Sequence, residues 1–230
     1  ARLRYRKGGM IMEDAVMLLS GGMDSGVLLA WARGRYRTIH ALTFDYGSKH
    51  APREIVMAQR LAQQYGATFT VVELRFMAEL FSSSLLSTGP EVPDGPYRTD
   101  SIATTAVPFR NGIMLSIAVG YAENLKAPLV LIASHAGDHP IYPDCTPDFI
   151  DALSRAATLG TFGGIRVEAP FASYDKKRIA SIGRELGLDF TMTWSCYKGR
   201  ELHCGTCATC LERKEALEHA SGKDPTRYLA

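Results

Sequence analysis

The chain has 230 residues, of which 46% are hydrophobic and 22% are charged, and its formal net charge is +2. This length suits one large α/β domain or one domain with an appendage, and the composition is that of an ordinary globular protein. The charge balance argues against a strong electrostatic grip on nucleic acid, so we expect no direct nucleic-acid partner. The sequence contains no run of 18 apolar residues, so we expect neither a membrane span nor a membrane partner.

The first twelve residues form a basic stretch that contains Arg2, Arg4, Arg6 and Lys7. The apolar run after this stretch is short and lacks a cleavage site. We therefore interpret residues 1–12 as a flexible arm and not as a secretory signal.

An apolar run over residues 15–19 predicts a buried strand, and Ser20-Gly21-Gly22-Met23-Asp24-Ser25 and then a helical pattern follow it. Two adjacent glycines allow positive φ and the close approach of a ligand. The amide groups at the start of a helix, with the hydroxyls of Ser20 and Ser25, predict an anion site. Asp24 can cap the helix or help to hold a magnesium ion that carries phosphates. The alternative is an ordinary Gly-Gly turn capped by Asp24.

The glycine stretch is neither GxxxxGK[ST], because no lysine follows the glycines, nor GxGxxG. It resembles the pyrophosphate loop of the ATP-pyrophosphatase superfamily, whose members adenylate a substrate and release pyrophosphate. The resemblance implies ATP and Mg²⁺ as cofactors, with catalytic roles for Ser20, Asp24 and Ser25. It also implies that ATP is bound by consecutive residues, namely Leu19, Ser20, Gly21, Gly22, Met23, Asp24, Ser25, Gly26, Val27, Leu28 and Leu29.

Strand and helix patterns alternate through the next 150 residues. Strands are predicted over residues 38–44, 68–74, 129–133 and 166–171, and helices over 52–65, 108–126, 147–159 and 175–186, the last capped near Ser173. This order predicts an α/β fold with a parallel, doubly wound sheet and helices on both faces. Ligands of such sheets bind beyond the carboxyl ends of the strands, which places residues 20–25, Asp45 and residues 135–139 in one crevice.

Residues 81–106 differ from the rest of the predicted domain because they are rich in Ser, Thr, Gly and Pro. A long loop of this kind is either a lid or a disordered segment. Because the segment is not highly charged, we favour a lid over the crevice.

Four of the five cysteines lie within fifteen positions, namely Cys196, Cys204, Cys207 and Cys210. This spacing favours a metal site in a reducing compartment, and hence a cytoplasmic location, over a disulfide framework. Four thiolates form the closed tetrahedral shell of a structural zinc, although His203 could replace one of them. An iron–sulfur cluster and a redox pair are the alternatives. We interpret Cys145 as a plain turn residue, with a catalytic nucleophile as the alternative.

Two distant signals combine with the loop motif. Trp194-Ser195-Cys196 and the segment from His203 to Arg213 lie near the end, and Phe44-Asp45-Tyr46-Gly47, Pro108-Phe109-Arg110-Asn111 and Tyr142-Pro143-Asp144-Cys145 lie between. Together they resemble the 7-cyano-7-deazaguanine synthases of the queuosine pathway, the QueC family. The resemblance covers residues 15–220 and implies an ATP-dependent ligase. Such an enzyme converts 7-carboxy-7-deazaguanine and ammonia to the nitrile through an adenylated acid and an amide, and we expect a homodimer.

The same resemblance implies residue roles. The four clustered cysteines match the zinc ligands of the family. Asp45 and Arg110 are candidates for the nucleotide, and Asp138 and Asp144 are candidates for the amine edge of the deazaguanine, because a carboxylate accepts from paired N–H groups. Their alternatives are a turn former for Asp45, a surface cation for Arg110 and caps for the other two.

The sequence departs from the family pattern at two positions. Thr146 follows the Tyr-Pro-Asp-Cys motif where the family often has an arginine, and Ser48 replaces a glutamine.

The predicted organisation is an arm over 1–12, an ATP-binding α/β domain over 13–189 and a zinc-binding segment over 190–230. The resemblance implies an adenine nucleotide alpha hydrolase-like, Rossmann-like fold. Two other functions remain open: attachment of a deazaguanine acid to a protein or use in DNA modification, and a zinc-knuckle nucleic-acid-binding protein.

Overall fold

Five parallel strands form the central sheet of the computed structural model, which describes residues 5–6, 9–10, 12–138 and 142–229. The strands lie in the order β5-β4-β3-β6-β7. Their bounds are β3 (Ala15–Leu18), β4 (Ile39–Asp45), β5 (Thr68–Glu73), β6 (Leu129–Leu131) and β7 (Arg166–Glu168). In the register of the sheet, Ala15 of β3 lies opposite Ile39 of β4 and Leu129 of β6. The predicted parallel, doubly wound α/β fold is confirmed.

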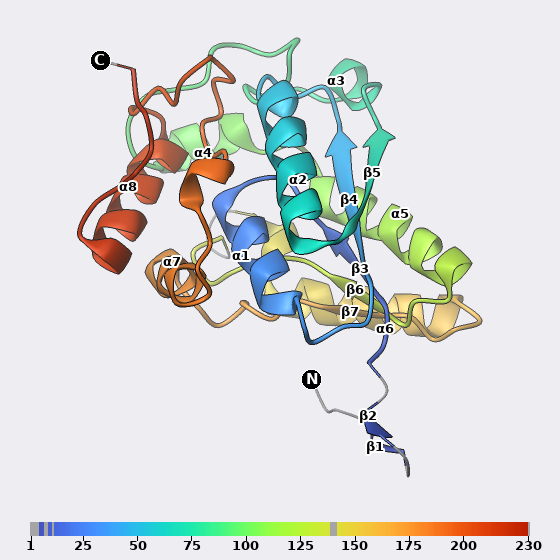
Figure 1. Cartoon of the computed structure of the whole chain (residues 1–230). Coiled ribbons are helices and arrows are strands. Elements are labelled where there is room, and N and C mark those ends of the chain that lie inside the picture. The colour runs from blue at the N-terminus through green and yellow to red at the C-terminus, as the bar shows by residue number, and fades with distance from the viewer. Residues whose placement is uncertain (1–4, 7–8, 11, 139–141, 230) are drawn as a thin grey trace.

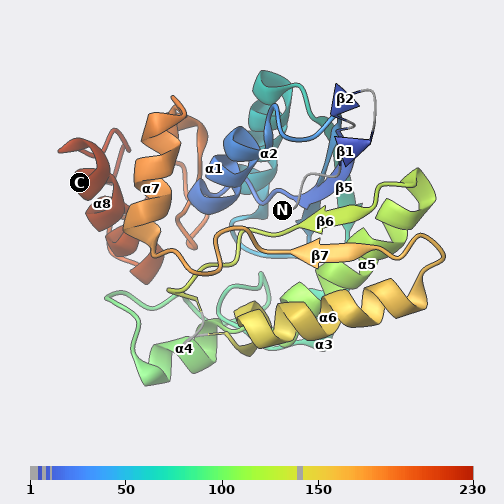
Figure 2. The ribbon, with the colours of Figure 1, turned by 90° about the horizontal axis from the view of Figure 1, so that it is seen from below.

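Helices cover both faces of this sheet (Figures 1 and 2). One side carries α1 (Met23–Ala32), α2 (Ala51–Tyr65), α7 (Lys176–Glu185) and α8 (Ala208–Ser221). The other side carries α5 (Arg110–Leu125) and α6 (Pro147–Gly160). Short elements join them, namely α3 (Met77–Leu80), α4 (Thr99–Thr105) and the 3₁₀ turns η1 (Pro143–Cys145) and η2 (Phe190–Met192). Because both faces are covered, β3 is buried throughout and reads as one continuous apolar run.

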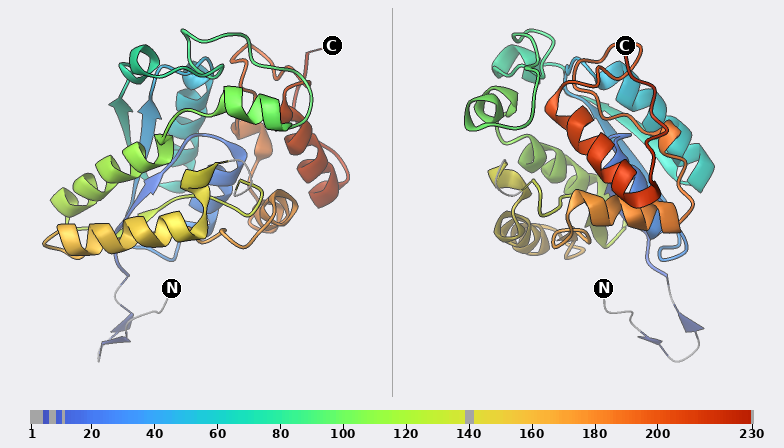
Figure 3. Two further views of the ribbon diagram at one scale, coloured as in Figure 1. Left: turned by 180° about the vertical axis from the view of Figure 1, so that it is seen from behind. Right: turned by 90° about the vertical axis from the view of Figure 1, so that its left-hand side faces the viewer.

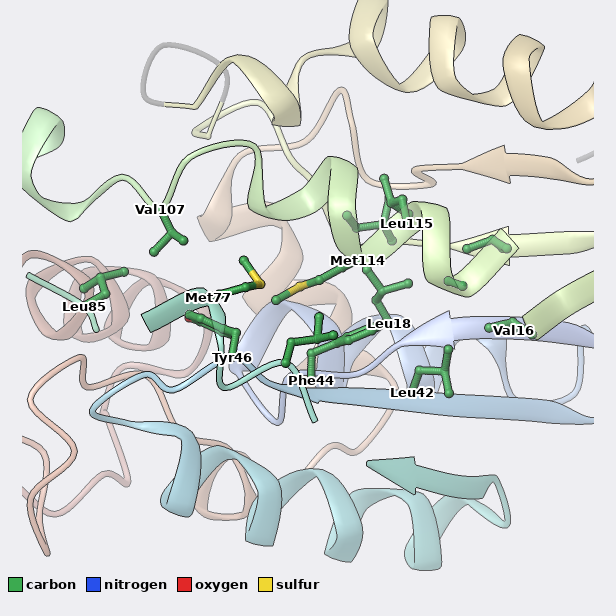
Figure 4. Packing of buried hydrophobic residues seen from close by; sticks show 14 of the residues in the cluster. Val16, Leu18, Leu42, Phe44, Tyr46, Met77, Leu85, Val107, Met114 and Leu115 are labelled. Atoms are coloured by element: carbon green, nitrogen blue, oxygen red, sulfur yellow. The ribbon is translucent and has the colours of Figure 1, made fainter. Parts of the chain in front are cut away.

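The α5 side of the sheet buries one large hydrophobic cluster (Figure 4). Val16 and Leu18 of β3 and Leu42 of β4 pack there against Met114 and Leu115 of α5. The cluster extends into the segment after α3, which contributes the fully buried Leu85 and Leu86.

The segment over residues 81–98 is therefore anchored to the core. The ammonium group of Lys49 donates to the carbonyl oxygens of Ser84 at 2.9 Å and Gly89 at 3.0 Å. This packing excludes the disordered alternative for these residues. The lid interpretation stays a prediction.

Two predicted boundaries were wrong. The strand predicted over 166–171 ends at Glu168. Helix α7 begins at Lys176 and is capped by Asp175, whose carboxylate accepts from the amide of Arg178 at 2.7 Å, so Ser173 is not the cap. Helix α8 begins at Ala208, and Cys207 occupies its N-cap position.

One stretch, Ile102–Leu125, is long and apolar enough to pass a length and hydropathy test for membrane spans. In the structure it is two helices, since α4 ends at Thr105 and α5 begins at Arg110. Helix α5 packs on the sheet and fully buries Leu115 and Ala118. The stretch therefore contains a core helix of the domain.

The predicted flexible arm over residues 1–12 falls mostly outside the described residues. Two pieces of it are described, β1 (Tyr5–Arg6) and β2 (Gly9–Met10), which pair with each other in an antiparallel ribbon. This ribbon lies away from the five-stranded sheet (Figure 3).

Candidate active site

The loop between β3 and α1 lies at the carboxyl edge of the sheet, beside a cavity that is lined by residues from both sides of the sheet. Ser20 accepts a hydrogen bond from the amide of Gly22 at 3.1 Å, and its hydroxyl lies 3.0 Å from that of Ser25. Ser25 in turn donates to the carbonyl oxygen of Gly22 at 3.2 Å. These bonds fix the loop around the first turn of α1, whose amide groups have no intrahelical partners. The arrangement presents donors to an anion in the cavity.

Gly21 and Gly22 have different tasks in this loop. Gly21 has a φ of +83°, and a β-carbon there would lie 2.8 Å from the amide nitrogen of Ala58 and closer still to the carbonyl oxygen of Glu54. It therefore lets the loop lie against the backbone of α2. Gly22 is the N-cap of α1 and lines the cavity.

The eleven residues predicted to bind ATP fall into two groups, those that line the cavity and those that pack behind it. Its cavity-lining members are Leu19, Ser20, Gly22, Met23, Asp24 and Ser25. The other five, Gly21, Gly26, Val27, Leu28 and Leu29, pack behind the cavity wall. These five support the loop from the protein side.

Asp24 belongs to a group of charged residues that we call the aspartate cluster, consisting of Asp24, His135, Asp138 and Lys176. Its Oδ2 lies 3.7 Å from Nε2 of His135 and 3.8 Å from Nζ of Lys176, and His135 lies 3.5 Å from Asp138. Burial alone would raise the pKa of Asp24, but Lys176 and His135 lower it to about 2. The carboxylate is therefore ionised at neutral pH. The cap alternative for Asp24 is wrong, because Gly22 is the N-cap of α1 and no side chain caps this helix.

The second oxygen of Asp24 is suited to a hard cation. Oδ1 is buried and has no hydrogen-bond partner among the residues that the structure describes. A buried carboxylate oxygen without a partner is costly, and carboxylate oxygens are the protein ligands that Mg²⁺ prefers. Asp24 therefore fits a magnesium ion beside the loop.

Lys176 is held from two sides. Its ammonium group lies 2.7 Å from Oε2 of Glu212 on α8 and faces Asp24 on α1. Burial lowers its pKa, but these two carboxylates raise it above the ordinary value of a lysine. The cavity thus has a permanent cation beside the loop, and sequence reasoning missed it. Its place at the start of the helix after β7 could have indicated Lys176 as a site residue, because ligand-binding groups gather at the carboxyl ends of parallel strands.

The far part of the cavity is lined by a second group that we call the tyrosine cluster: Tyr46, His50, Glu54, Tyr97, Arg110 and Tyr197. Tyr46 accepts from Nη1 of Arg110 at 3.2 Å, and its hydroxyl lies 3.2 Å from Nε2 of His50. That same nitrogen lies 3.7 Å from Glu54, and the hydroxyls of Tyr97 and Tyr197 lie 3.3 Å apart. Burial raises the pKa of Glu54 to about 8, and burial with the nearby Arg110 lowers that of His50 to about 4.

Two predicted site residues lie outside this cavity. Asp45 accepts from Nε of Arg75 at 2.7 Å and from the amide of Gly47 at 3.1 Å, and it borders a separate small pocket. Asp144 accepts from the amide of Asn111 at 2.8 Å, in the first turn of α5. Both therefore have the structural roles of a turn former and a cap, whereas Asp138 and Arg110 line the cavity.

Cys145 and Thr146, which follow Asp144, also have structural explanations. The side-chain Nδ2 of Asn111 donates to Sγ of Cys145 at 3.0 Å, and burial raises the pKa of this thiol to about 12. A thiol with such a pKa is a poor nucleophile. Thr146 caps α6 by accepting from the amide of Phe149 at 3.3 Å. This position therefore serves the helix and does not line the cavity.

The four predicted metal ligands come together in the structure. The sulfur atoms of Cys196, Cys204, Cys207 and Cys210 all lie within 4.8 Å of one another, and all four residues are buried. Amides of the chain donate to two of these sulfurs, as in metal-binding turns. The thiolate cluster therefore fits one tetrahedral metal ion. His203 is not part of it, because its Nε2 accepts from the amide of Ser195 at 3.1 Å.

The thiolate cluster and the buried Arg213 hold one wall of the cavity. Trp194 and Ser195, which precede the first cysteine, line the cavity. The guanidinium of Arg213 donates to the hydroxyls of Thr193 at 2.8 Å and Ser195 at 3.1 Å and to the carbonyl oxygen of Phe190 at 2.7 Å. The C-terminal segment thus shapes the site next to the loop.

Comparisons with known proteins point to one family. A model of the family described as queuosine biosynthesis protein QueC matches residues 14–221. The 7-cyano-7-deazaguanine synthase of Desulfotalea psychrophila is 53% identical over 218 residues, covering 95% of this chain and all of that protein. The enzyme of the same name from Porphyromonas gingivalis is 46% identical over 216 residues, covering 94% and 97%.

Among solved structures, NMN synthetase from Francisella tularensis is similar, with a TM-score of 0.54, 14% identity, and coverage of 94% of this chain and 79% of that one. The U34-tRNA thiolase NcsA from Methanococcus maripaludis has a TM-score of 0.51 and 16% identity, covering 77% and 58%. These two likenesses concern the fold alone. On the family match and the identities to its members, the chain belongs to the QueC family of queuosine biosynthesis proteins.

Proposed function

We propose that this protein is an ATP-dependent ligase that converts 7-carboxy-7-deazaguanine and ammonia to 7-cyano-7-deazaguanine. Family membership supports the product, since the relatives carry that enzyme name over their whole length. The single observation that carries the ATP-dependent chemistry is the loop of Ser20, Gly22 and Ser25, which faces the cavity beside the ionised Asp24, whose Oδ1 has no hydrogen-bond partner in the described part of the chain.

The reaction needs two activations. A carboxylate oxygen attacks the α-phosphate of ATP, pyrophosphate leaves, and ammonia then displaces AMP to give the amide. The amide oxygen attacks the α-phosphate of a second ATP and pyrophosphate leaves; loss of AMP, which carries away that oxygen, and of the two protons on nitrogen then gives the nitrile. An oxide is a poor leaving group and AMP is a good one, so catalysis consists mainly of positioning and of charge stabilisation around phosphates.

The aspartate cluster and the loop suit the phosphate side of this reaction. Loop amides and Lys176 would bind the phosphates, and Asp24 would hold a Mg²⁺ ion, which supplies charge neutralisation when it is bound. Asp138 lines the same cavity and is our candidate for the amine edge of the deazaguanine. We leave Asp45 and Asp144 out of the site, because their carboxylates are used by Arg75 and Asn111.

For the thiolate cluster we propose zinc with a bracing role. Four buried thiolates form a closed shell without an open coordination position, so the metal would stabilise residues 190–221 and take no part in the reaction. We also propose a homodimer, and a cytoplasmic location because the clustered cysteines favour a reducing compartment.

The test is a product analysis. Purified protein is incubated with 7-carboxy-7-deazaguanine, Mg²⁺-ATP and ammonium, and the products are identified by mass spectrometry, with Asp24→Asn as the control protein. We expect the nitrile, with two AMP for each molecule formed. Amide alone, or turnover only with an added protein acceptor, would favour attachment to a macromolecule. Oligonucleotide binding without ATP consumption would favour a nucleic-acid-binding protein.

A further inference from the structure

Arg110 is a half-buried cation without an anionic partner among the described residues. Its guanidinium donates to the hydroxyl of Tyr46 at 3.2 Å, and its Cζ lies 5.6 Å from the centre of that ring. Within the described chain, no Asp or Glu oxygen lies within 4.0 Å of it. A guanidinium removed from water is costly unless an anion compensates it. The side chain lines the cavity, so a bound anion can reach it.

The neighbours of Arg110 do not compensate its charge at neutral pH. Burial raises the pKa of Glu54 to about 8, so this carboxyl is largely neutral at pH 7. Burial and Arg110 lower the pKa of His50 to about 4, so the imidazole is neutral as well. The remaining groups that face the guanidinium are Tyr142, Tyr197 and the thiol of Cys145. The tyrosine cluster therefore carries about one net positive charge.

The phosphate side of the cavity already has its own donors. Lys176 and Asp24, whose Oδ1 is our candidate for holding Mg²⁺, lie beside the loop amides, and no described contact joins them to Arg110. Besides ATP, the proposed reaction brings in one anionic group, the carboxylate of the deazaguanine acid. A guanidinium presents paired N–H groups that match a carboxylate in a bidentate manner.

We propose that Arg110 binds the carboxylate of 7-carboxy-7-deazaguanine and that Tyr46 positions it, an inference that rests on the function proposed above. The acid is the only anionic deazaguanine in the sequence of steps, since the amide and the nitrile are neutral. Arg110 therefore favours the acid over the amide and contributes to the first activation only. This replaces the role at the nucleotide that the sequence suggested for Arg110.

The experiment compares two entry points into one reaction. Wild-type protein and Arg110→Gln are assayed with 7-carboxy-7-deazaguanine, ATP and ammonium, and separately with 7-amido-7-deazaguanine and ATP. We expect KM for the acid to rise about 10- to 100-fold, the loss for a hydrogen-bonded charged pair. KM for the amide and for ATP should stay within about twofold. Arg155→Gln, which neutralises an exposed arginine on α6, should change none of these values.

Other results overturn the inference. An equal loss with acid and amide, or a higher KM for ATP, would assign Arg110 to the nucleotide or to the fold, and unchanged values would remove it from binding. If Arg110→Gln does not fold, Arg110→Lys keeps the charge without the planar fork and must still raise the ratio of the two KM values. A wild-type protein that converts neither compound would refute the proposed function itself.

Discussion

Replacing Gly21 by alanine tests the geometry of the loop most directly. A side chain at a φ of +83° costs about 1–2 kcal/mol. The new β-carbon would also collide with the carbonyl oxygen of Glu54 and the amide nitrogen of Ala58, which are backbone atoms of α2 and cannot turn aside. Such overpacking costs about a further 1–3 kcal/mol. We therefore expect Gly21→Ala to lower the free energy of unfolding by about 2–5 kcal/mol.

A matched control separates the collision from the backbone strain. Gly66 ends the same helix α2 with a φ of +69°, and a β-carbon there would meet no atom within 4 Å. Gly66→Ala should therefore cost only the strain, about 1–2 kcal/mol. The two variants are compared by urea denaturation at pH 7 with zinc held constant, and the stabilisation by added ATP is measured in each.

If Gly21→Ala and Gly66→Ala unfold at the same urea concentration, the close approach of the loop to α2 is refuted. If Gly21→Ala is destabilised as expected but ATP stabilises it as much as the wild type, the loop does not bind the nucleotide.

Three further predictions concern Asp24, Glu54 and the thiolate cluster. Asp24→Asn should reduce turnover at least about 100-fold, because the variant loses the negative charge beside the phosphates. The protein should stay folded, because Lys176 keeps its ion pair with Glu212. Glu54 has a folded pKa of about 8, above its unfolded value, so the native state binds more protons between these values and stability falls as pH rises through that window. Glu54→Gln should therefore gain stability relative to wild type from pH 5 to pH 8 in urea titrations. Metal chelation should speed hydrogen exchange in residues 190–221 before it affects the sheet.

Each of these predictions has its own control. Asp151→Asn, on the exposed face of α6, should leave turnover unchanged, and full activity in Asp24→Asn would exclude Asp24 from the mechanism. Glu218→Gln, a substitution of an exposed residue on α8, is the control, and a stability of Glu54→Gln that follows that of wild type at every pH would contradict the raised pKa. Added Zn²⁺ should reverse the effect of the chelator, and unchanged stability after complete metal removal would rule out the bracing role.

The sequence by itself determined the order of elements, the position of the loop and the cysteine cluster. These features are local: an apolar run followed by Ser20-Gly21-Gly22 indicates a strand and a turn whatever surrounds it, and the C-x-x-C spacing places the thiols within reach of one ion. The α/β fold follows from the alternation of such signals, and the structure confirms it.

The boundaries and the polar groups of the site were decided only by tertiary structure. Asp45, Asp138 and Asp144 look alike in sequence, since each follows a strand or lies in a turn. Arg75 binds the carboxylate of Asp45, and the amide of Asn111 donates to the carboxylate of Asp144. Of the three aspartates, only Asp138 lines the cavity.

Lys176, Glu54 and His50 had no motif to mark them, because their roles depend on partners brought together from α1, α2, α5 and α8. A pKa shift of the size seen for Glu54 requires burial, which is a property of the assembled packing and not of neighbouring residues in the chain. The sequence therefore predicted the position of the phosphate-binding loop, and only the tertiary structure determined which side chains surround it.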